Sequence, residues 1–176
     1  MNKTLCVTAL ALLLGIGAFP CRMLAQSPTP FGATYSPVAK FDPQRDAAKD
    51  IADALREALR SDRRVLLDVG GEWCIWCRRL DTLFIRNADL ADFLHSNYVV
   101  VKVNYSKENK NESVLSRYPK IPGYPHMFVL DQDGTLLHSQ DTGELESGKG
   151  HDPAKVLSFL ETWSLSRRRA GDKTER

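Results

Sequence analysis

The sequence predicts an α/β fold of three layers, in which helices cover both faces of a mixed central β-sheet. Two apolar runs rich in β-branched residues, 65–69 and 98–103, are separated by helical sequence. Such a strand–helix–strand connection implies a parallel pair. Residues 127–130 and 135–139 flank a four-residue turn and form a predicted antiparallel hairpin. Helical segments before, between and after these strands supply the two outer layers.

The first helix is predicted to begin with Asp42 as its N-cap and Pro43 in the first helical position. Apolar residues then recur at three- and four-residue spacing, which indicates one buried face. Ser61 and Asp62 end the helix. The apolar face consists of Ala47, Ile51, Ala54, Leu55, Ala58 and Leu59.

The run at 65–69 (VLLDV) is short and apolar apart from Asp68, which is typical of a buried central strand. The two glycines at 70–71 end this strand. The next helical segment is predicted over 78–84, directly after a pair of closely spaced cysteines.

Asp89 is predicted to cap a second short helix over 90–95, which leads into the strand at 98–103. Residues 107–118 are polar and are predicted to form a loop that contains a short helix. Regular structure is excluded just beyond this loop by two prolines, Pro119 and Pro122.

The segment that follows the hairpin, 144–151, is rich in glycine and is predicted to be mobile. Asp152 and Pro153 then repeat the N-cap signal and open a final amphipathic helix that runs through Trp163. The last residues, 166–176, are predicted to be a polar tail.

Residues 1–25 have the composition of a secretory signal peptide, with a positive start and an uncharged apolar run over 5–19. This run is shorter than the ~18 to 20 apolar residues that a spanning helix needs. Cleavage is predicted after Ala25. Two alternatives stay open: an uncleaved anchor, and a lipoprotein whose lipid is carried by Cys21. Pro20, which precedes that cysteine, departs from the small residue expected there.

The chain therefore divides into a signal peptide at 1–25, a flexible leader at 26–41, one domain at 42–165 and the tail at 166–176. Cleavage lowers the formal net charge of +2 to 0, because the first segment holds two basic residues and no acidic ones. A neutral domain has no electrostatic reason to bind nucleic acid. Cleavage also removes two of the four cysteines, Cys6 and Cys21.

The two cysteines that remain, Cys74 and Cys77, are spaced as Cys-x-x-Cys between a strand and a helix. The first would lie at the helix N-terminus, where free N–H groups and the helix dipole stabilise a thiolate. A thiolate attacks a disulfide, and the second cysteine, one turn further on, is placed to resolve the mixed disulfide. We therefore expect Cys74 to be the nucleophile and Cys77 the resolving thiol.

Two other interpretations of the cysteine pair exist. One is half of a zinc site, but zinc normally takes four ligands and no second pair is present. The other is a structural disulfide, which would close a very small loop and so contribute little stability. The four histidines show no paired metal-ligand spacing: His95, His126, His138 and His151.

The sequence resembles the thioredoxin family over residues 42–163, through the segment VLLDVGGEWCIWC at 65–77 and the Tyr124-Pro125 step. It is more similar to exported thioredoxin-like domains, including the periplasmic end domain of membrane electron-transfer reductases. The resemblance implies a thioredoxin fold with a cis-proline, Pro125, that faces the cysteines. It departs from thioredoxin in the Ile75-Trp76 pair between the cysteines, which leaves the redox potential open.

The resemblance also implies roles for residues around the cysteines. Asp68 occupies the place of the family's buried acid, where burial should raise its pKa and allow it to accept the Cys77 proton. The other interpretation is a strand-end acid that reaches solvent or caps the next helix. Trp73, Trp76 and Tyr124 are expected beside the substrate, although Trp73 is expected to pack on the fold and leave only Trp76 exposed.

Beside the proposed cis-proline, His126 can either contact substrate or be a partly buried structural histidine. Glu72 also matches the family pattern.

The expected function is thiol–disulfide exchange on protein disulfides outside the cytoplasm, in the periplasm or an equivalent compartment. The reductive direction is preferred, and it requires an upstream electron donor because the compartment oxidises dithiols. We expect no cofactor, metal, nucleic acid or membrane anchor, and a monomer. The alternatives are a peptide-binding module without turnover and a metal-binding domain.

Overall fold

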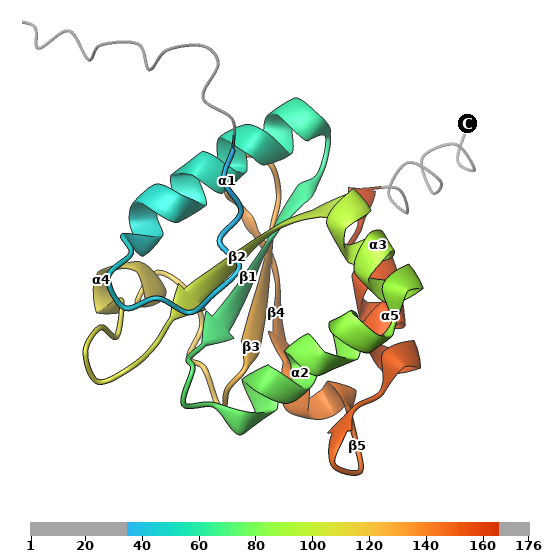
Figure 1. Cartoon of the computed structure of the whole chain (residues 1–176). Helices are drawn as coiled ribbons and strands as arrows, with labels where there is room; N and C mark the ends of the chain where they lie inside the picture. Colours follow the sequence, from blue (N-terminus) through green and yellow to red (C-terminus); the bar gives the residue numbers. More distant parts are fainter. Residues whose placement is uncertain (1–34, 166–176) are drawn as a thin grey trace, which may run out of the picture. The chain divides into compact units, whose positions relative to one another are not determined.

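The computed structural model describes residues 35–165, drawn in colour in Figure 1. The predicted signal peptide, Cys21 as the lipid carrier of the lipoprotein alternative, most of the leader and the polar tail lie outside the described residues. Within 35–165, no helix combines the length and apolar character that crossing a membrane requires.

The central sheet has four strands in the order β2-β1-β3-β4. β1 (Arg64–Gly70) lies inside the sheet, parallel to β2 (Tyr98–Asn104) and antiparallel to β3 (His126–Leu130). β4 (Leu136–Asp141) completes the hairpin with β3. The predicted mixed sheet and the central place of the 65–69 strand are confirmed. Each residue of β1 is buried, which agrees with its almost continuous apolar sequence.

One face of the sheet is covered by α1 (Ala47–Ser61) and by the short α4 (Glu112–Leu115). The short helix predicted in the 107–118 loop is thus confirmed. The predicted start of the first helix at Asp42 is wrong: the N-cap is Asp46, whose carboxylate accepts the Lys49 N–H at 3.1 Å. Asp42 instead caps a preceding turn through the Gln44 N–H. The apolar face is confirmed except for Leu59, which is 69% exposed.

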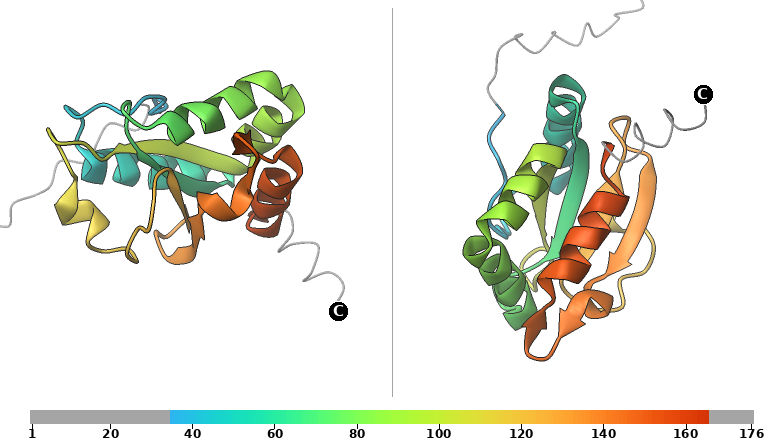
Figure 2. Two further views of the ribbon diagram at one scale, coloured as in Figure 1. Left: turned by 90° about the horizontal axis from the view of Figure 1, so that it is seen from below. Right: turned by 90° about the vertical axis from the view of Figure 1, so that its right-hand side faces the viewer.

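The other face carries α2 (Ile75–Arg86), α3 (Ala88–Asn97) and α5 (Pro153–Thr162). Figure 2 shows these helices together on their side of the strands. Asp152 caps α5 as predicted, since its carboxylate accepts the Ala154 and Lys155 N–H groups. Asp89 is not a cap, because it is the second residue of α3, whose N-cap residue is Asn87. Leu66, Met127 and Val129 pack from the sheet against these helices.

The segment predicted as mobile, 144–151, has regular structure. A 3₁₀ turn, η1 (Thr142–Leu145), leads into a two-residue hairpin of β5 (Glu146–Ser147) and β6 (Gly150–His151). β6 packs against α2, and the right-hand view of Figure 2 shows the hairpin near the start of that helix. The hairpin is therefore ordered by a contact that the glycine-rich sequence does not reveal.

The last part of the predicted leader, residues 35–41, is docked on the edge of the sheet. Val38 forms a parallel bridge with Val101, and its carbonyl accepts the Lys102 N–H at 3.2 Å. Phe41 is only 4% exposed. This segment therefore belongs to the folded structure, unlike the flexible leader that its composition suggests.

Candidate functional site

Cys74 and Cys77 lie where the sequence places them, at the junction of β1 and α2. Cys74 is the N-cap residue of α2, and its sulfur accepts the Cys77 N–H at 3.0 Å. The two residues form a disulfide, with 5.2 Å between their Cα atoms. In the reduced protein the same N–H is positioned to stabilise a Cys74 thiolate. The arrangement is suited to forming and breaking this one bond.

The disulfide is enclosed by side chains. Cys74 is 3% exposed and Cys77 is 1% exposed, and together with Phe41 they form a small buried cluster. The rings of Trp76 and Tyr124 pack against that cluster. Cys74 retains the larger exposed fraction, as expected of the leading cysteine, but an incoming disulfide reaches its sulfur only when covering side chains move.

Gly70 permits the close approach of β1 to the second sulfur. A Cβ atom at this position would lie 2.5 Å from the Cys77 Sγ and 3.2 Å from the Cζ of Phe41. No side chain fits in that space without displacing the ring or the sulfur. Gly70 therefore makes room for Phe41 and Cys77 together.

Trp73 stands at the mouth of the site, with its ring 56% exposed. Its Nε1 donates to the Tyr105 carbonyl at 2.7 Å, and its ring meets the Tyr124 ring edge-on. Tyr124 in turn stacks on Tyr105 at 4.8 Å between ring centroids. The second glycine, Gly71, allows this, because a Cβ there would lie 2.3 Å from the Trp73 Nε1. Burial and the neighbouring Tyr105 raise the pKa of Tyr124 to about 12, so it is a neutral phenol near neutral pH.

Trp76 is half-buried, and the expectation that it alone is exposed is wrong. Its ring meets His151 of β6 edge-on, with 5.7 Å between centroids. The Arg79 guanidinium lies 4.4 Å from the same ring. The side chain between the two cysteines is thus held by the hairpin that the sequence predicts as mobile. Trp73, by contrast, presents most of its surface to solvent.

The Tyr124-Pro125 peptide bond is cis, as the family resemblance implies. Pro125 is buried, and its carbonyl accepts a hydrogen bond from Thr142. His126 is 2% exposed and its Nε2 lies 2.8 Å from the Ser139 Oγ. Of the two interpretations of His126, the structure favours the buried histidine. Burial lowers its pKa.

Asp68 is buried in β1, near the strand end that leads to the cysteines, as one of three charged groups. The Lys102 Nζ lies 2.9 Å from an Asp68 carboxylate oxygen and 2.6 Å from an Asp81 oxygen. Burial raises the pKa of Asp68, and the Lys102 ammonium opposes this shift. Burial alone would lower the pKa of Lys102, but the two carboxylates raise it. The interpretation of Asp68 as a solvent-reaching or helix-capping acid is wrong.

Lys102, Asp81 and Phe41 are site residues that the sequence analysis missed. Lys102 had a signal: it is the one charged residue in the apolar run YVVVKV, just as Asp68 is in VLLDV. The register of β1 against β2 pairs these two residues directly. Phe41 carried no signal, because it precedes the first helix in a segment of polar composition.

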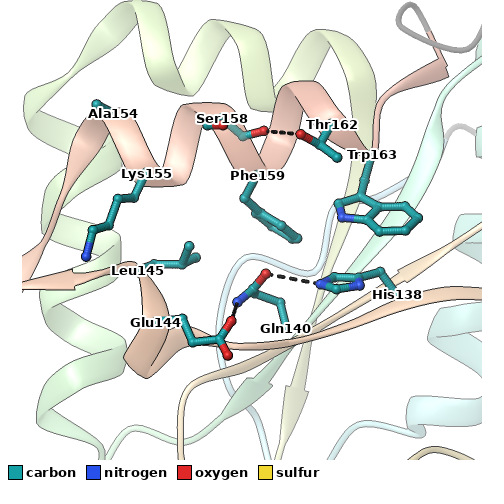
Figure 3. A pocket seen from close by; sticks show the side chains of 10 residues that line it. All are labelled: His138, Gln140, Glu144, Leu145, Ala154, Lys155, Ser158, Phe159, Thr162 and Trp163. Atoms are coloured by element: carbon teal, nitrogen blue, oxygen red, sulfur yellow. Dashed lines mark hydrogen bonds between the residues drawn. The ribbon is translucent and has the colours of Figure 1, made fainter.

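The structure has a cavity beside Asp68 and a groove between β4 and α5. A cavity of about 380 Å³ is lined by Asp68, Asp81 and Lys102 together with apolar residues of α2, α3 and β2. An Asp68 oxygen, Oδ1, is buried without a hydrogen-bond partner. A separate groove of about 660 Å³ runs between β4 and α5, where His138 stacks on Trp163 (Figure 3). That groove contains neither cysteine.

Metal-ligating side chains do not gather anywhere in the described part of the chain: no group of three or more His, Cys, Asp or Glu is placed to hold an ion among residues 35–165.

Known proteins with related sequences are named for disulfide interchange or disulfide reduction. The chain is 28% identical over 145 residues to the thiol:disulfide interchange protein DsbD of a Pseudomonas species, which covers 78% of this chain and 23% of that protein. It is 23% identical over 95 residues to the disulfide bond reductase DsbH of Chlamydia pneumoniae, which covers 49% of this chain and 57% of that protein. The chain thus spans only part of the length of both relatives.

Solved structures agree on the fold. A disulphide isomerase from Xylella fastidiosa superposes with a TM-score of 0.61 at 25% identity, covering 69% of this chain and 94% of that one. The oxidised C-terminal domain of DsbD from Neisseria meningitidis gives a TM-score of 0.53 at 20% identity, over 71% of this chain and 99% of the domain. The family described as Thioredoxin-like matches residues 46–132. With its four-stranded mixed sheet, its Cys74–Cys77 disulfide and its cis-proline, the chain has a thioredoxin-like fold.

Proposed function

We propose that the protein is a thiol–disulfide oxidoreductase that acts on protein disulfides outside the cytoplasm. The observation that carries the proposal is the position of Cys74: its sulfur caps the first turn of α2 and is bonded to Cys77 one turn further on. This geometry stabilises a thiolate at Cys74 and keeps a second thiol within reach of any mixed disulfide formed there. The relatives named for disulfide interchange and disulfide reduction support the same chemistry.

In the reductive direction the reaction has two steps. The Cys74 thiolate attacks one sulfur of the substrate disulfide, a bond forms between Cys74 and that sulfur, and the other substrate sulfur leaves as a thiolate. The Cys77 thiol loses its proton and attacks the Cys74 sulfur. The Cys74–Cys77 bond then forms as the mixed disulfide breaks. The substrate gains two electrons and two protons, and the protein is oxidised to the state seen here.

Asp68 is the group proposed to take the Cys77 proton. It is buried in β1, two residues before Gly70, and its raised pKa brings its affinity for a proton closer to that of a thiol. Its free Oδ1 has no hydrogen-bond partner, so it retains the capacity to accept a proton through a water molecule. Lys102, shared between Asp68 and Asp81, keeps the carboxylate charge balanced in the interior.

The substrate is proposed to lie across Trp73, Trp76, Tyr124 and Pro125. Trp73 is the most exposed of these side chains. Tyr124, beside the cis-proline, contacts the Trp73 ring and also packs against the cluster that holds the disulfide. Ile75, 50% exposed, adds an apolar side chain between the cysteines. Such a surface suits an extended protein segment with apolar residues next to its cysteine.

An exported, reducing role is proposed from two observations. The apolar run at 5–19 has the composition of a signal sequence and supports export to the periplasm or an equivalent compartment. Burial of both sulfurs among apolar rings favours the uncharged disulfide over the thiolate, in opposition to the helix N-terminus at Cys74, and so makes the dithiol a better electron donor. A reducing protein in an oxidising compartment needs a separate dithiol donor to reset it. No resident cofactor is needed for these steps.

The test is a trap. Replacing the resolving thiol, Cys77→Ser, should leave Cys74 joined to its substrates and its donor as mixed disulfides when the full chain is expressed in an exporting host. These adducts should be absent from the Cys74→Ser/Cys77→Ser double variant. The proteins captured identify the substrates, and their redox states in cells lacking this chain give the direction.

A peptide-binding module without turnover is the second candidate, and the 3% exposure of Cys74 is the observation that favours it. Alkylation of the reduced protein separates the two. An oxidoreductase has a Cys74 that alkylates faster at neutral pH than a free cysteine with a pKa of about 8.5. A Cys74 that reacts no faster, together with an empty trap, would leave only the binding function.

A further inference from the structure

The leader segment 35–41 is held at two points, one on β2 and one beside the dithiol site. At Val38 it pairs with β2, and three residues later the Phe41 N–H donates to the Glu72 Oε1 at 3.3 Å. Glu72 lies two residues before Cys74, in the turn between β1 and α2. The segment thus delivers Phe41 into the site from more than thirty residues upstream of the cysteines.

The Phe41 ring touches two chemically different parts of the site. One edge of the ring lies over Gly70 beside the Cys77 sulfur. A Cβ atom at Gly70 would lie 2.5 Å from the Cys77 Sγ and 3.2 Å from the Phe41 Cζ. The ring face meets the Lys102 ammonium, with 4.3 Å from Nζ to the ring centroid. Lys102 holds Asp68 and Asp81 on its other sides. Among the described residues, Phe41 therefore joins the sulfur cluster to the charged cluster.

We infer that Phe41 is a positioning residue of the dithiol site, which keeps water from the Cys77 sulfur and holds the Lys102 ammonium against Asp68. The inference rests on the proposed function and deepens it. It assigns a part of the reaction to a residue outside the sheet, the cysteine turn and the cis-proline.

Two physical effects follow from this position. An apolar cover disfavours the charged form of a thiol, so Phe41 keeps Cys77 protonated until the mixed disulfide exists. An aromatic face attracts a cation most strongly where water is excluded, so the ring fixes the direction of the Lys102 side chain. The charged groups that contact Phe41 are Glu72 before α2, which accepts its N–H, and Lys102 on β2, which lies over its ring. Asp68 on β1 and Asp81 on α2 contact Lys102 in turn.

The test measures the titration of Cys77 alone. In a full-length background with Cys6, Cys21 and Cys74 replaced by serine, Cys77 is the only thiol of the chain, and the ultraviolet absorbance of its thiolate is followed against pH. Phe41→Ala removes the cover and the ring face, whereas Phe41→Leu keeps an apolar cover and loses the ring face. Phe159→Leu is the matched control, because Phe159 is a buried phenylalanine of α5 outside the site.

We expect Phe41→Ala to lower the midpoint of the Cys77 titration by about one pH unit, which is a tenfold change in the thiolate equilibrium. Phe41→Leu should shift it less, and Glu72→Ala, which removes the anchor of the segment, should shift it in the same direction. Phe159→Leu should leave it unchanged. If Phe41→Ala fails to fold, Phe41→Leu and Glu72→Ala decide the question.

The inference is overturned if the Phe41 and Glu72 variants that fold titrate like Phe159→Leu. This readout needs no turnover, so it is independent of the trap. An empty trap with a shifted Cys77 titration contradicts the proposed function and leaves the role of Phe41 standing. A trap that captures substrates together with an unshifted Cys77 titration supports the proposed function and contradicts the role of Phe41.

Discussion

At the scale of single residues, Gly70 shows how tightly the cysteine site is packed. Its missing side chain leaves the space that the Cys77 sulfur and the Phe41 ring occupy. We expect Gly70→Ala to lower the unfolding free energy of the oxidised protein by about 1 to 3 kcal/mol, the usual cost of overpacking. Denaturant unfolding measures the loss.

The control for this prediction is Gly123→Ala, since a Cβ at Gly123 meets no atom within 4 Å. Its effect should stay within about 0.5 kcal/mol. Equal effects of the two substitutions would show that the space above Gly70 is not constrained.

Asp68 is the residue on which the pH dependence of the second step is expected to rest. Only its ionised form accepts a proton, so the rate of Cys77 attack should fall as the pH drops through the Asp68 pKa. Burial raises that pKa, and the fall should therefore lie above the ordinary value of about 3.9. Asp68→Asn should slow the step about 100-fold and remove this dependence.

The measurement is the release of a coloured thiol from a mixed disulfide preformed on Cys74. Asp133→Asn, in the exposed turn between β3 and β4, is the control and should behave as the wild type. An Asp68→Asn variant with the wild-type rate and pH profile would remove Asp68 from the mechanism.

The sequence was sufficient to find the residues of the site that carry a local signature. A few neighbouring residues are enough to recognise each of them: the spacing of Cys74 and Cys77, the acid within an apolar strand, and the proline before β3. Phe41 and Asp81 could not be found this way, because their roles arise only when the leader and α2 meet the end of β1. The exposure of Trp73 over Trp76 was missed for the same reason: it depends on contacts with Tyr105 and with His151.

At the scale of elements, the β5–β6 hairpin holds the segment between the cysteines through His151. This side chain is 6% exposed, meets the Trp76 ring, and has no hydrogen-bond partner on either ring nitrogen. Burial lowers its pKa, and the nearby Arg79 lowers it further. The folded protein therefore binds a proton at His151 less readily than the unfolded chain does.

The stability that the neutral His151 contributes should consequently be fully present above the ordinary histidine pKa of about 6.5. It should be lost as the pH falls through the lower pKa of His151 in the folded protein. We expect His151→Phe, which retains an aromatic ring against Trp76, to make the loss between about pH 7 and 5 smaller. The difference is bounded by about 1.4 kcal/mol per pH unit, the limit for one proton. Urea unfolding at several pH values measures it.

His126 contributes in the same direction, since burial also lowers its pKa, so His151→Phe should reduce the dependence and not abolish it. The same substitution at His95, exposed on α3, is the control. A His151→Phe variant that loses stability with falling pH as steeply as the wild type would contradict the prediction.

Element boundaries show where local sequence was an incomplete guide. Asp42-Pro43 and Asp152-Pro153 present the same capping signal, yet only the second begins a helix. Before α1, Val38 pairs with β2 and Phe41 is inserted beside Cys77, and the chain then makes a turn over 43–45. The helix can start only once those contacts are made, at Asp46. Contacts with residues distant in sequence thus prevented the capping signal at Asp42-Pro43 from starting a helix there.

At the scale of the whole molecule, the three-layer arrangement was predictable because it depends on element order and on two periodicities. The alternating side chains of β1 divide between two cores: Val65, Leu67 and Val69 face α1, while Leu66 faces α2, α3 and α5. Asp68 falls on the side of Leu66, toward α2. Its position under the cysteine helix is therefore a consequence of strand alternation, and β2 supplies Lys102 from the neighbouring register.

The direction of electron flow is also a property of the whole fold, because it compares the disulfide with the dithiol in the same surroundings. Both cysteines are enclosed by Phe41, Trp76 and Tyr124, which are all aromatic side chains. Such surroundings stabilise a neutral disulfide over a thiolate. We therefore expect a reduction potential nearer the reducing value of about −270 mV than the oxidising value of about −120 mV.

Equilibration of the purified protein with dithiothreitol of known redox ratio measures that potential, with alkylation reporting the oxidised fraction. The same balance requires the oxidised protein to resist urea more than the reduced one does, because the fold favours the disulfide. A potential near the oxidising value, with a reduced form more stable than the oxidised form, would reverse the proposed direction. The exchange chemistry at Cys74 and Cys77 would then serve to donate disulfides, with the same atoms and the steps run backward.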